Sequence, residues 1–108
     1  MAPVLNIVAV TSCTTGIAQT YMAADVLERC ARAKGHTIKV ETQGALGTIN
    51  PITRSDLRSA DVVILTDDTA IDDVARFAGM TIITVKIDDI LTAPHSIIDR
   101  LMPSGSQH

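Results

Sequence analysis

The chain alternates between short, almost continuously apolar segments and longer segments in which apolar residues recur at helical spacing. Val4–Val10 and Val62–Leu65 are apolar at nearly every position, which is typical of strands covered on both faces of a parallel sheet. Residues 17–34 carry an apolar stripe that includes Leu27 and Ala31, and this spacing predicts a helix packed on that sheet.

One segment has a strictly alternating pattern instead. In His36–Thr42, Ile38 and Val40 face one side, whereas Lys39 and Glu41 face the other. A strand with one apolar and one polar face keeps its polar face in solvent and is common at sheet edges. We therefore expect an edge strand here, with Lys39 and Glu41 exposed.

The remaining segments complete an alternation of strands and helices. Thr53 and Asp56 have the spacing of a capping box and predict a short helix that reaches about Ala60. The other expected elements are a structured loop at Gln43–Pro51, a helix at Thr69–Phe77, a strand at Met80–Ile87 and a helix from about Pro94 to Met102. Such alternation implies right-handed crossovers. The sequence thus predicts an α/β fold: a single three-layer domain with a four-stranded parallel sheet (order 2-1-3-4) and helices on both faces.

Length and charge limit the class of protein. A chain of 108 residues suits one domain, which we place at residues 1–103, followed by a flexible C-terminal tail at residues 104–108. The net charge is −3, and Tyr21 and Phe77 are the only aromatic residues. Nucleic acid is therefore not expected as a partner, because its binding needs basic patches and aromatic platforms.

Targeting segments and metal ligands are not evident either. The apolar runs fall far short of the roughly 20 residues of a membrane span, and the N-terminus lacks the basic segment of a signal peptide. We therefore expect a cytoplasmic protein that does not itself span the membrane and whose two cysteines are free thiols. No cofactor and no metal are expected, because the histidines lack ligand spacing and suit the solvated surface. They are His36, His95 and His108.

The candidate site follows from the topology. Parallel α/β sheets bind ligands at the carboxyl ends of their strands, next to the switch in strand order, and this points to residues 11–20. Cys13 lies there, among small residues between the first strand and the first helix. Backbone N–H groups and the positive end of the helix dipole would lower the pKa of its thiol and bind a phosphoryl dianion. Cys13 is thus a candidate nucleophile that carries or cleaves phosphate, unless it merely closes a turn. Cys30, on the apolar stripe, is expected to be an inert core residue.

Neighbouring residues are candidate ligands of the phosphoryl group. Hydroxyl groups in the loop could donate hydrogen bonds to phosphate oxygens or satisfy backbone groups of a tight turn, and the sequence leaves both roles open. The candidate phosphate-binding loop comprises Thr11, Ser12, Thr14, Thr15, Gly16, Ile17, Ala18, Gln19 and Thr20. Gln43 and Gly44 should lie beside it, either as part of a partner surface or packed against this loop.

The sixth residue after the cysteine helps to distinguish phosphate hydrolysis from phosphoryl transfer. Phosphatases of this architecture have an arginine there, whose guanidinium group binds the phosphate oxygens, but this chain has Gln19. A general acid would have to come from an aspartate of a nearby loop, and these residues fit better as helix caps. They are Asp67, Asp68, Asp72 and Asp73. Hydrolysis is therefore disfavoured relative to holding a phosphoryl group for transfer.

The cysteine loop also resembles a known signature. Residues 10–24 read V-T-S-C-T-T-G-I-A-Q-T-Y-M-A-A and resemble the V-T-A-C-P-T-G-I-A-H-T-Y-M-A-A signature of fructose-type enzyme IIB domains of the bacterial phosphoenolpyruvate-dependent sugar phosphotransferase system. Lys39–Gly44 and Ala60–Leu65 are similar to the same family, and Arg76–Gly79 matches its R-F-x-G element. The resemblance reaches to about residue 103.

This resemblance implies a phosphoryl relay in sugar uptake. Cys13 would accept a phosphoryl group from a phosphohistidine of enzyme IIA and pass it, as phosphocysteine, to a sugar, expected to be fructose, bound by the membrane enzyme IIC. The chain would then be a phosphotransferase that works at the inner face of the bacterial cell membrane when bound to enzyme IIC. Thr14 replaces the family's proline and restores a backbone N–H, and Gln19 replaces its histidine and removes an ionisable neighbour. The alternatives are a low-molecular-weight phosphatase or arsenate-reductase-like enzyme, and a non-catalytic regulatory module.

Overall fold

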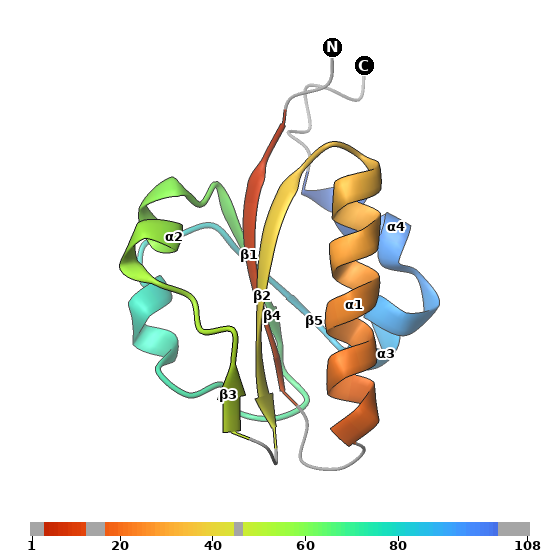
Figure 1. Ribbon diagram of the computed structural model, residues 1–108, viewed down its shortest axis with the longest axis horizontal. Helices are drawn as coiled ribbons and strands as arrows, with labels where there is room; N and C mark the ends of the chain where they lie inside the picture. The colour runs from red at the N-terminus through yellow and green to blue at the C-terminus, as the bar shows by residue number, and fades with distance from the viewer. Residues whose placement is uncertain (1–3, 13–16, 45–46, 102–108) are drawn as a thin grey trace.

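The computed structural model describes residues 4–12, 17–44 and 47–101. In chain order the elements are β1 (Asn6–Ser12), α1 (Ile17–Ala33), β2 (Thr37–Gly44), β3 (Gly47–Ile49), α2 (Arg54–Ser59), β4 (Val62–Thr66), the 3-10 helix η1 (Val74–Phe77), β5 (Ile82–Val85), α3 (Ile87–Thr92) and α4 (Pro94–Arg100) (Figure 1). Several predictions fall outside the described residues: those for Cys13, Thr14, Thr15, Gly16 and His108, the domain end at residue 103 and the tail at 104–108.

The sheet differs from the expected one. It has five strands in the order β3-β2-β1-β4-β5, and β3 runs antiparallel to β2. The prediction of four parallel strands was therefore wrong, because the sheet is mixed. Its parallel part, β2-β1-β4-β5, has the order expected for the four predicted strands.

The fifth strand arises in the segment interpreted as a loop, Gln43–Pro51. There β2 continues to Gly44, and β3 turns back so that Thr42 pairs with Ile49. Gly47 has a φ of +87°, which glycine adopts without the steric cost that a Cβ would bring. Because β3 borders the carboxyl half of β2, β2 is not the edge strand that its alternation suggested.

Helices cover both faces of the sheet. Figure 1 shows α1, α3 and α4 on one face, and α2 and η1 on the other. Successive residues of β1 serve the two sides, because side chains alternate along a strand: Ile7 packs in the core with Leu27 of α1, and Val8 packs in the core with Phe77 of η1. No helix within the described ranges is long and apolar enough to cross a membrane.

The carboxyl half of the chain is more irregular than expected. The helix predicted at Thr69–Phe77 is only the 3-10 turn η1, since Asp73 just before it has a left-handed backbone with a φ of 58°. The predicted strand at Met80–Ile87 shortens to β5, and α3 follows at once. An aspartate from another loop favours this start, because Oδ1 of Asp68 accepts a hydrogen bond from the Ile87 N–H at 2.8 Å.

Three side chains test the predicted exposure. His36 is buried, contrary to expectation, and its Nδ1 accepts a hydrogen bond from the backbone N–H of Leu5 at 3.0 Å. His95 is exposed and Cys30 is buried, as predicted, and Cys30 Sγ lies 3.9 Å from Nε2 of His95. The prediction that His36 lies on the surface was wrong because the backbone N–H of Leu5, far away in the sequence, gives the buried ring a hydrogen-bond partner.

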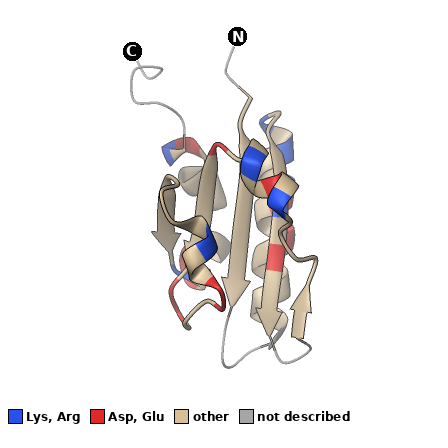
Figure 2. Ribbon diagram, turned by 90° about the vertical axis from the view of Figure 1, so that its left-hand side faces the viewer, with Lys and Arg blue, Asp and Glu red and all other residues tan. Residues whose placement is uncertain are grey.

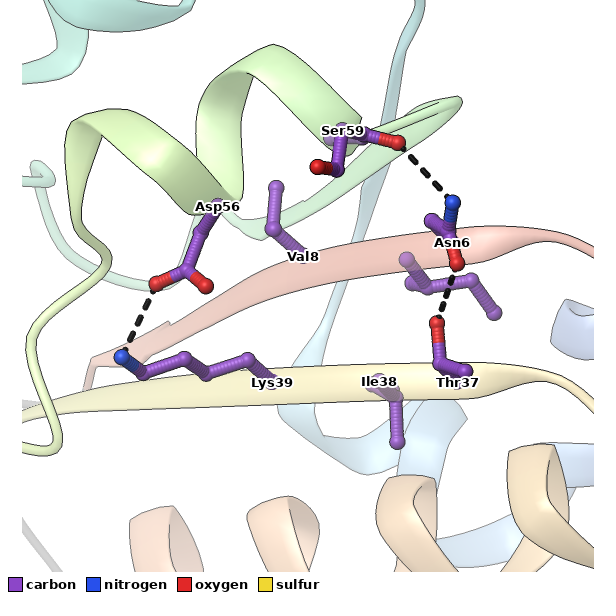
Figure 3. A pocket seen from close by; sticks show the side chains of 9 residues that line it. Asn6, Val8, Thr37, Ile38, Lys39, Asp56 and Ser59 are labelled. Carbon is purple, nitrogen blue, oxygen red and sulfur yellow. Dashed lines mark hydrogen bonds and ion pairs between the residues drawn. The ribbon is translucent and has the colours of Figure 1, made fainter.

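Helix α2 depends on polar contacts at its start, because none of its residues is fully buried. Thr53 and Asp56 form the predicted capping box, and Asp56 also pairs with Lys39 of β2 at 2.9 Å (Figure 3). The backbone N–H of Thr53, the ammonium group of Lys39 and the Thr53 hydroxyl together lower the pKa of Asp56 to about 2. The carboxylate therefore stabilises the fold only while it is ionised.

Asp56→Asn tests this contribution. Asparagine keeps an acceptor for the Thr53 N–H but loses the charge that faces Lys39 and the helix N-terminus, so we expect a loss of about 0.3–1 kcal/mol in the free energy of unfolding at neutral pH. Because folding lowers the pKa of Asp56, its stabilisation is complete above about pH 4 and disappears as the pH falls toward about 2. Urea unfolding at several pH values should therefore show a steeper acid loss for the wild type than for the variant. Parallel profiles would contradict the assignment.

Candidate functional site

The candidate site lies where the carboxyl ends of β1, β2 and β4 meet, beside the start of α1 (Figure 1). Thr11 and Ser12, predicted as loop residues, are the last two residues of β1 and are buried. Ser12 pairs in register with Gln43 of β2. In the sequence Cys13 follows Ser12 directly, so the described residues define where the chain enters and leaves segment 13–16.

A threonine of the neighbouring strand fixes the end of β1. Thr66, the last residue of β4, is 1% exposed, and its Oγ1 accepts a hydrogen bond from the Ser12 N–H at 3.0 Å. The same hydroxyl group donates to the carbonyl oxygen of Val10 at 3.4 Å. The sequence did not single out Thr66, because a threonine at the end of a β-branched run reads as an ordinary strand residue.

Hydroxyl groups gather on the α1 side of this edge. Thr11 donates its hydroxyl proton to the carbonyl oxygen of Thr20 at 3.2 Å, so it satisfies a backbone group, which is one of the two roles that the sequence left open. The side-chain oxygens of Thr20, Tyr21 and Thr42 are buried and have no hydrogen-bond partner within the described part of the chain. Tyr21 also lies against β2, since a Cβ on Gly44 would be 3.6 Å from its hydroxyl oxygen. The α1 side of this edge therefore carries neutral hydroxyl donors.

The first turn of α1 adds a positive electrostatic contribution without a charged side chain. The first N–H groups of a helix have no partner within the helix, and together with the helix dipole they favour an anion. No acidic residue opposes them in the first turn of α1. Ala18 and Gln19 are exposed there, and residues 17–24 contain no charged residue. In Figure 2 this end of α1 and strand β3 carry no charge colour.

On the opposite face of the sheet, a buried carboxylate was missed. Glu41 was expected in solvent but is 1% exposed, because Arg76 of η1 reaches it with two hydrogen bonds, of 2.9 Å to Oε1 and 2.6 Å to Oε2. The backbone N–H of Ile52 and the side-chain amide of Gln43 donate to the same carboxylate at 2.8 and 2.7 Å. Burial by itself raises the pKa of Glu41, but these donors hold the pKa below its ordinary value.

Gln43 extends this network to the β4–η1 loop. Its Nε2 donates to the carbonyl oxygen of Asp72 at 3.2 Å, and its Oε1 accepts from the Asp72 N–H at 2.8 Å. Its side chain is buried, so at the candidate partner surface it acts by holding the strand end, whereas Gly44 is half-buried.

The other aspartates of this loop have structural partners. Asp68 bonds the start of α3, Asp67 pairs with Lys86 at 2.9 Å, and Asp73 lies 3.9 Å from Nε of Arg76. None of these aspartates caps the helix predicted at Thr69–Phe77, because η1 has no side-chain cap hydrogen bond and Asp68 bonds the start of α3 instead. Across residues 4–12, 17–44 and 47–101, no group of three or more metal-ligating side chains comes together.

Comparison with known proteins adds independent information. The profile of a family described as "PTS system, Lactose/Cellobiose specific IIB subunit" matches residues 8–100. The "PTS system fructose-like EIIB component 2" of Escherichia coli K12 is 50% identical over 96 residues, which cover 89% of this chain and 91% of that protein. The "PTS system fructose-specific EIIB'BC component" of Rhodobacter capsulatus is 40% identical over 101 residues, which cover 94% of this chain but 17% of that protein.

Solved structures agree in fold. A domain of the fructose-specific IIABC component of Borrelia burgdorferi superposes with a TM-score of 0.85 at 38% identity, covering 94% of this chain and 98% of that one. The predicted fructose-specific IIB of Escherichia coli gives a TM-score of 0.82 at 37% identity, with coverages of 94% and 87%.

Thr66→Val tests the anchor at the end of β1. Valine keeps the shape but leaves the buried Ser12 N–H without its acceptor, so we expect a loss of about 1–3 kcal/mol in unfolding free energy. Thr66→Ser keeps the hydroxyl group and loses one methyl group, at a cost of about 0.8 kcal/mol. Denaturant unfolding of both variants gives the comparison. A valine variant as stable as the serine variant would mean that this hydrogen bond contributes nothing.

Proposed function

This chain belongs to the IIB family of the sugar phosphotransferase system, and we propose that it carries the phosphoryl group of that system on Cys13. As a family member it is a phosphotransferase component that relays phosphoryl groups during sugar uptake. The observation that carries the assignment of Cys13 is its place in the chain. It comes directly after the strand end that Thr66 and Gln43 anchor, and shortly before the start of α1.

The proposed relay has two displacement steps at phosphorus. The Cys13 thiolate attacks a phosphohistidine of enzyme IIA, so that an S–P bond forms, the P–N bond breaks and the freed imidazole takes up a proton. A sugar hydroxyl group then attacks the phosphocysteine. An O–P bond forms, the S–P bond breaks, the hydroxyl proton passes to solvent and the thiolate is regenerated. Neither step calls for a metal or a cofactor.

The surroundings suit a phosphoryl group that must leave again. Backbone N–H groups at the start of α1 and the neutral hydroxyl groups of Thr20, Tyr21 and Thr42 would stabilise a dianion through hydrogen bonds alone. Residues 17–24 and 42–53 supply no charged side chain. A phosphocysteine held in this way is stabilised without being trapped by an ion pair. The candidate phosphate-binding loop, residues 11–20, is therefore proposed as the binding segment.

The partners and the sugar are proposed from the relatives. The matching part of the Rhodobacter capsulatus protein belongs to one longer chain named as an EIIB'BC component, which supports enzyme IIC as the partner that holds the sugar. The relatives are named fructose-specific or fructose-like, which supports fructose as the sugar. The phosphoryl donor would be enzyme IIA, and the chain would act at the inner face of the cell membrane. Gly44 and its neighbours would contribute to the docking surface.

Cys13→Ser, paired with Cys30→Ser, tests the nucleophile. The serine hydroxyl group stays protonated near neutral pH, so we expect Cys13→Ser to lose phosphoryl acceptance entirely. Cys30 is buried in the core on α1, so Cys30→Ser should retain most of the activity. The measurement is incubation with phosphorylated enzyme IIA, followed by detection of an acid-stable, iodine-labile phosphoryl adduct. Equal loss in both variants would rule out Cys13 as the carrier.

Gln19→Arg tests why the chain transfers rather than hydrolyses. Gln19 is exposed in the first turn of α1, at the position where phosphatases of this architecture have their arginine. Charge-assisted hydrogen bonds are roughly twice as strong as neutral ones, so arginine should favour attack on a bound phosphate ester. We expect weak aryl-phosphatase activity and a loss of sugar phosphorylation. Gln19→His, the control, should keep or improve the relay.

Two assays separate the outcomes for residue 19. Hydrolysis of an aryl phosphate is measured on the chain alone, and transfer to sugar is measured with enzymes IIA and IIC present. If Gln19→Arg relays normally and hydrolyses nothing, the side chain at this position does not face the phosphoryl group.

A further inference from the structure

Two charged residues that the relay has not used meet inside the protein. Glu41 lies in β2 and Arg76 in η1, and they are 35 residues apart in the chain. Their side chains are 2% and 15% exposed, and the guanidinium group of Arg76 also lies 4.7 Å from the centre of the Phe77 ring. With donors from Arg76, Gln43 and Ile52, the Glu41 carboxylate receives four hydrogen bonds, which is about its full acceptor capacity.

Stability alone does not call for such a network. A buried ion pair is often no more stabilising than apolar residues of similar volume, because both charges must first lose their hydration. The network instead fixes how four parts of the fold are arranged relative to one another. It joins β2, the segment before α2, η1 and the β4–η1 loop through hydrogen bonds that require one relative arrangement of these parts.

Gln43 connects this network to the candidate site. Its Nε2 points to the carboxylate of Glu41, and its Oε1 points to the N–H of Asp72, so the amide group has one favourable orientation. Rotating it by half a turn would place its oxygen against a carboxylate and its N–H groups against a backbone donor. Gln43 is also the register partner of Ser12, which precedes Cys13 in the chain.

We propose that Glu41, Arg76 and Gln43 form a positioning network that sets the carboxyl ends of β1 and β2 against the β4–η1 loop, and that phosphoryl transfer at Cys13 depends on it. This inference rests on the proposed function. None of the three residues touches the phosphoryl group. They act through the backbone of Ser12 and the loop at Asp72, so their loss slows transfer without removing the nucleophile.

The chain contains a matched control on the same strand. Lys39 precedes Glu41 by two residues, and Figure 3 shows its ion pair with Asp56 of α2. That pair is more exposed, at 29% and 28%, and it lines a pocket of about 190 Å³ with Asn6 and Ser59. Asn6 and Thr37 are register partners at the start of β1 and β2, so this pocket lies toward the end of the sheet away from Ser12. Breaking this pair should cost stability but leave transfer unchanged.

The principal variant is Gln43→Met, compared with Lys39→Met. Methionine fills the space but neither donates to Glu41 nor bonds the backbone of Asp72. A displacement of about 1 Å can cost as much as 100-fold in rate, and we expect the maximal rate of phosphoryl acceptance from enzyme IIA to fall about tenfold or more. The Lys39→Met rate should stay within about twofold of wild type. Unfolding in urea gives the stability of both variants, so that the rates are compared at known fractions of folded protein.

A double variant separates positioning from simple stabilisation. Glu41→Met with Arg76→Met removes both buried charges together and should be more stable than either single variant. If the network only stabilises the fold, transfer should recover along with stability. We expect stability to recover and transfer to remain slow, because Gln43 no longer has a carboxylate to orient it. This comparison also covers the case in which a single variant fails to fold.

The reactivity of the thiol gives a readout that needs no enzyme IIA. In the Cys30→Ser background, the pH profile of Cys13 alkylation should shift for Gln43→Met and stay unchanged for Lys39→Met. Wild-type transfer and an unshifted profile in Gln43→Met would overturn the positioning network and leave the relay intact. Acceptance of phosphate by Cys13→Ser would instead overturn the proposed function itself.

Discussion

The arrangement of one face of the sheet depends on the buried carboxylate of Glu41. An ionised group that is 1% exposed would be very costly unless its lost hydration is replaced, so the fold must bring donors to it. Arg76 supplies two, and η1 delivers that side chain only after the chain passes Asp73 in a left-handed conformation. The same turn places Phe77 in the core, so a polar requirement and an apolar one are met by neighbouring residues. The left-handed residue that interrupts the predicted helix thus lies directly before the turn that carries both Arg76 and Phe77.

The two faces of the sheet are stabilised in different ways. On the α1 face, Leu27, Ile90 and Ile98 pack in a large apolar cluster, where shape and volume matter more than direction. The other face has a smaller cluster, and its helix α2 has no fully buried residue and relies on a capping box and an ion pair. Hydrogen bonds are directional, so this polar face can specify the position of a loop more closely than apolar contacts can. Both faces contribute to the edge at Ser12. The α1 face provides the start of helix α1, and the opposite face provides the hydrogen bonds that hold the end of β2 and the β4–η1 loop.

Sequence periodicity predicted the elements that are long or continuously apolar. It located β1, α1 and β4, and the rule that ligands bind at the switch in strand order then pointed to residues 11–20. It missed β3, because three residues are too few to establish a period, and it missed α3, whose start is favoured by Asp68 from a distant loop. Glu41 was placed in solvent because alternation identifies a polar face but cannot reveal an arginine 35 positions away. Thr66 was missed because a threonine at the end of a β-branched run gives no sign that its hydroxyl group bonds the backbone of a neighbouring strand.

The distribution of charge around this edge bears on transfer as opposed to hydrolysis. A guanidinium group free to bind phosphate would stabilise the transition state for attack by water as well as by a sugar. Here the forked donors of Arg76 are engaged by Glu41, and the ammonium group of Lys86 is paired with Asp67. On the α1 and β2 sides of the edge, residues 17–24 and 42–44 contain no charged side chain, whereas Asp67 and Asp68 follow the end of β4. The proposed phosphocysteine would therefore be stabilised by neutral donors and by the dipole of α1, whose strength depends on orientation more than on net charge. The placement of those donors then matters more than their number. A network of fixed hydrogen bonds behind the strand ends can provide that placement.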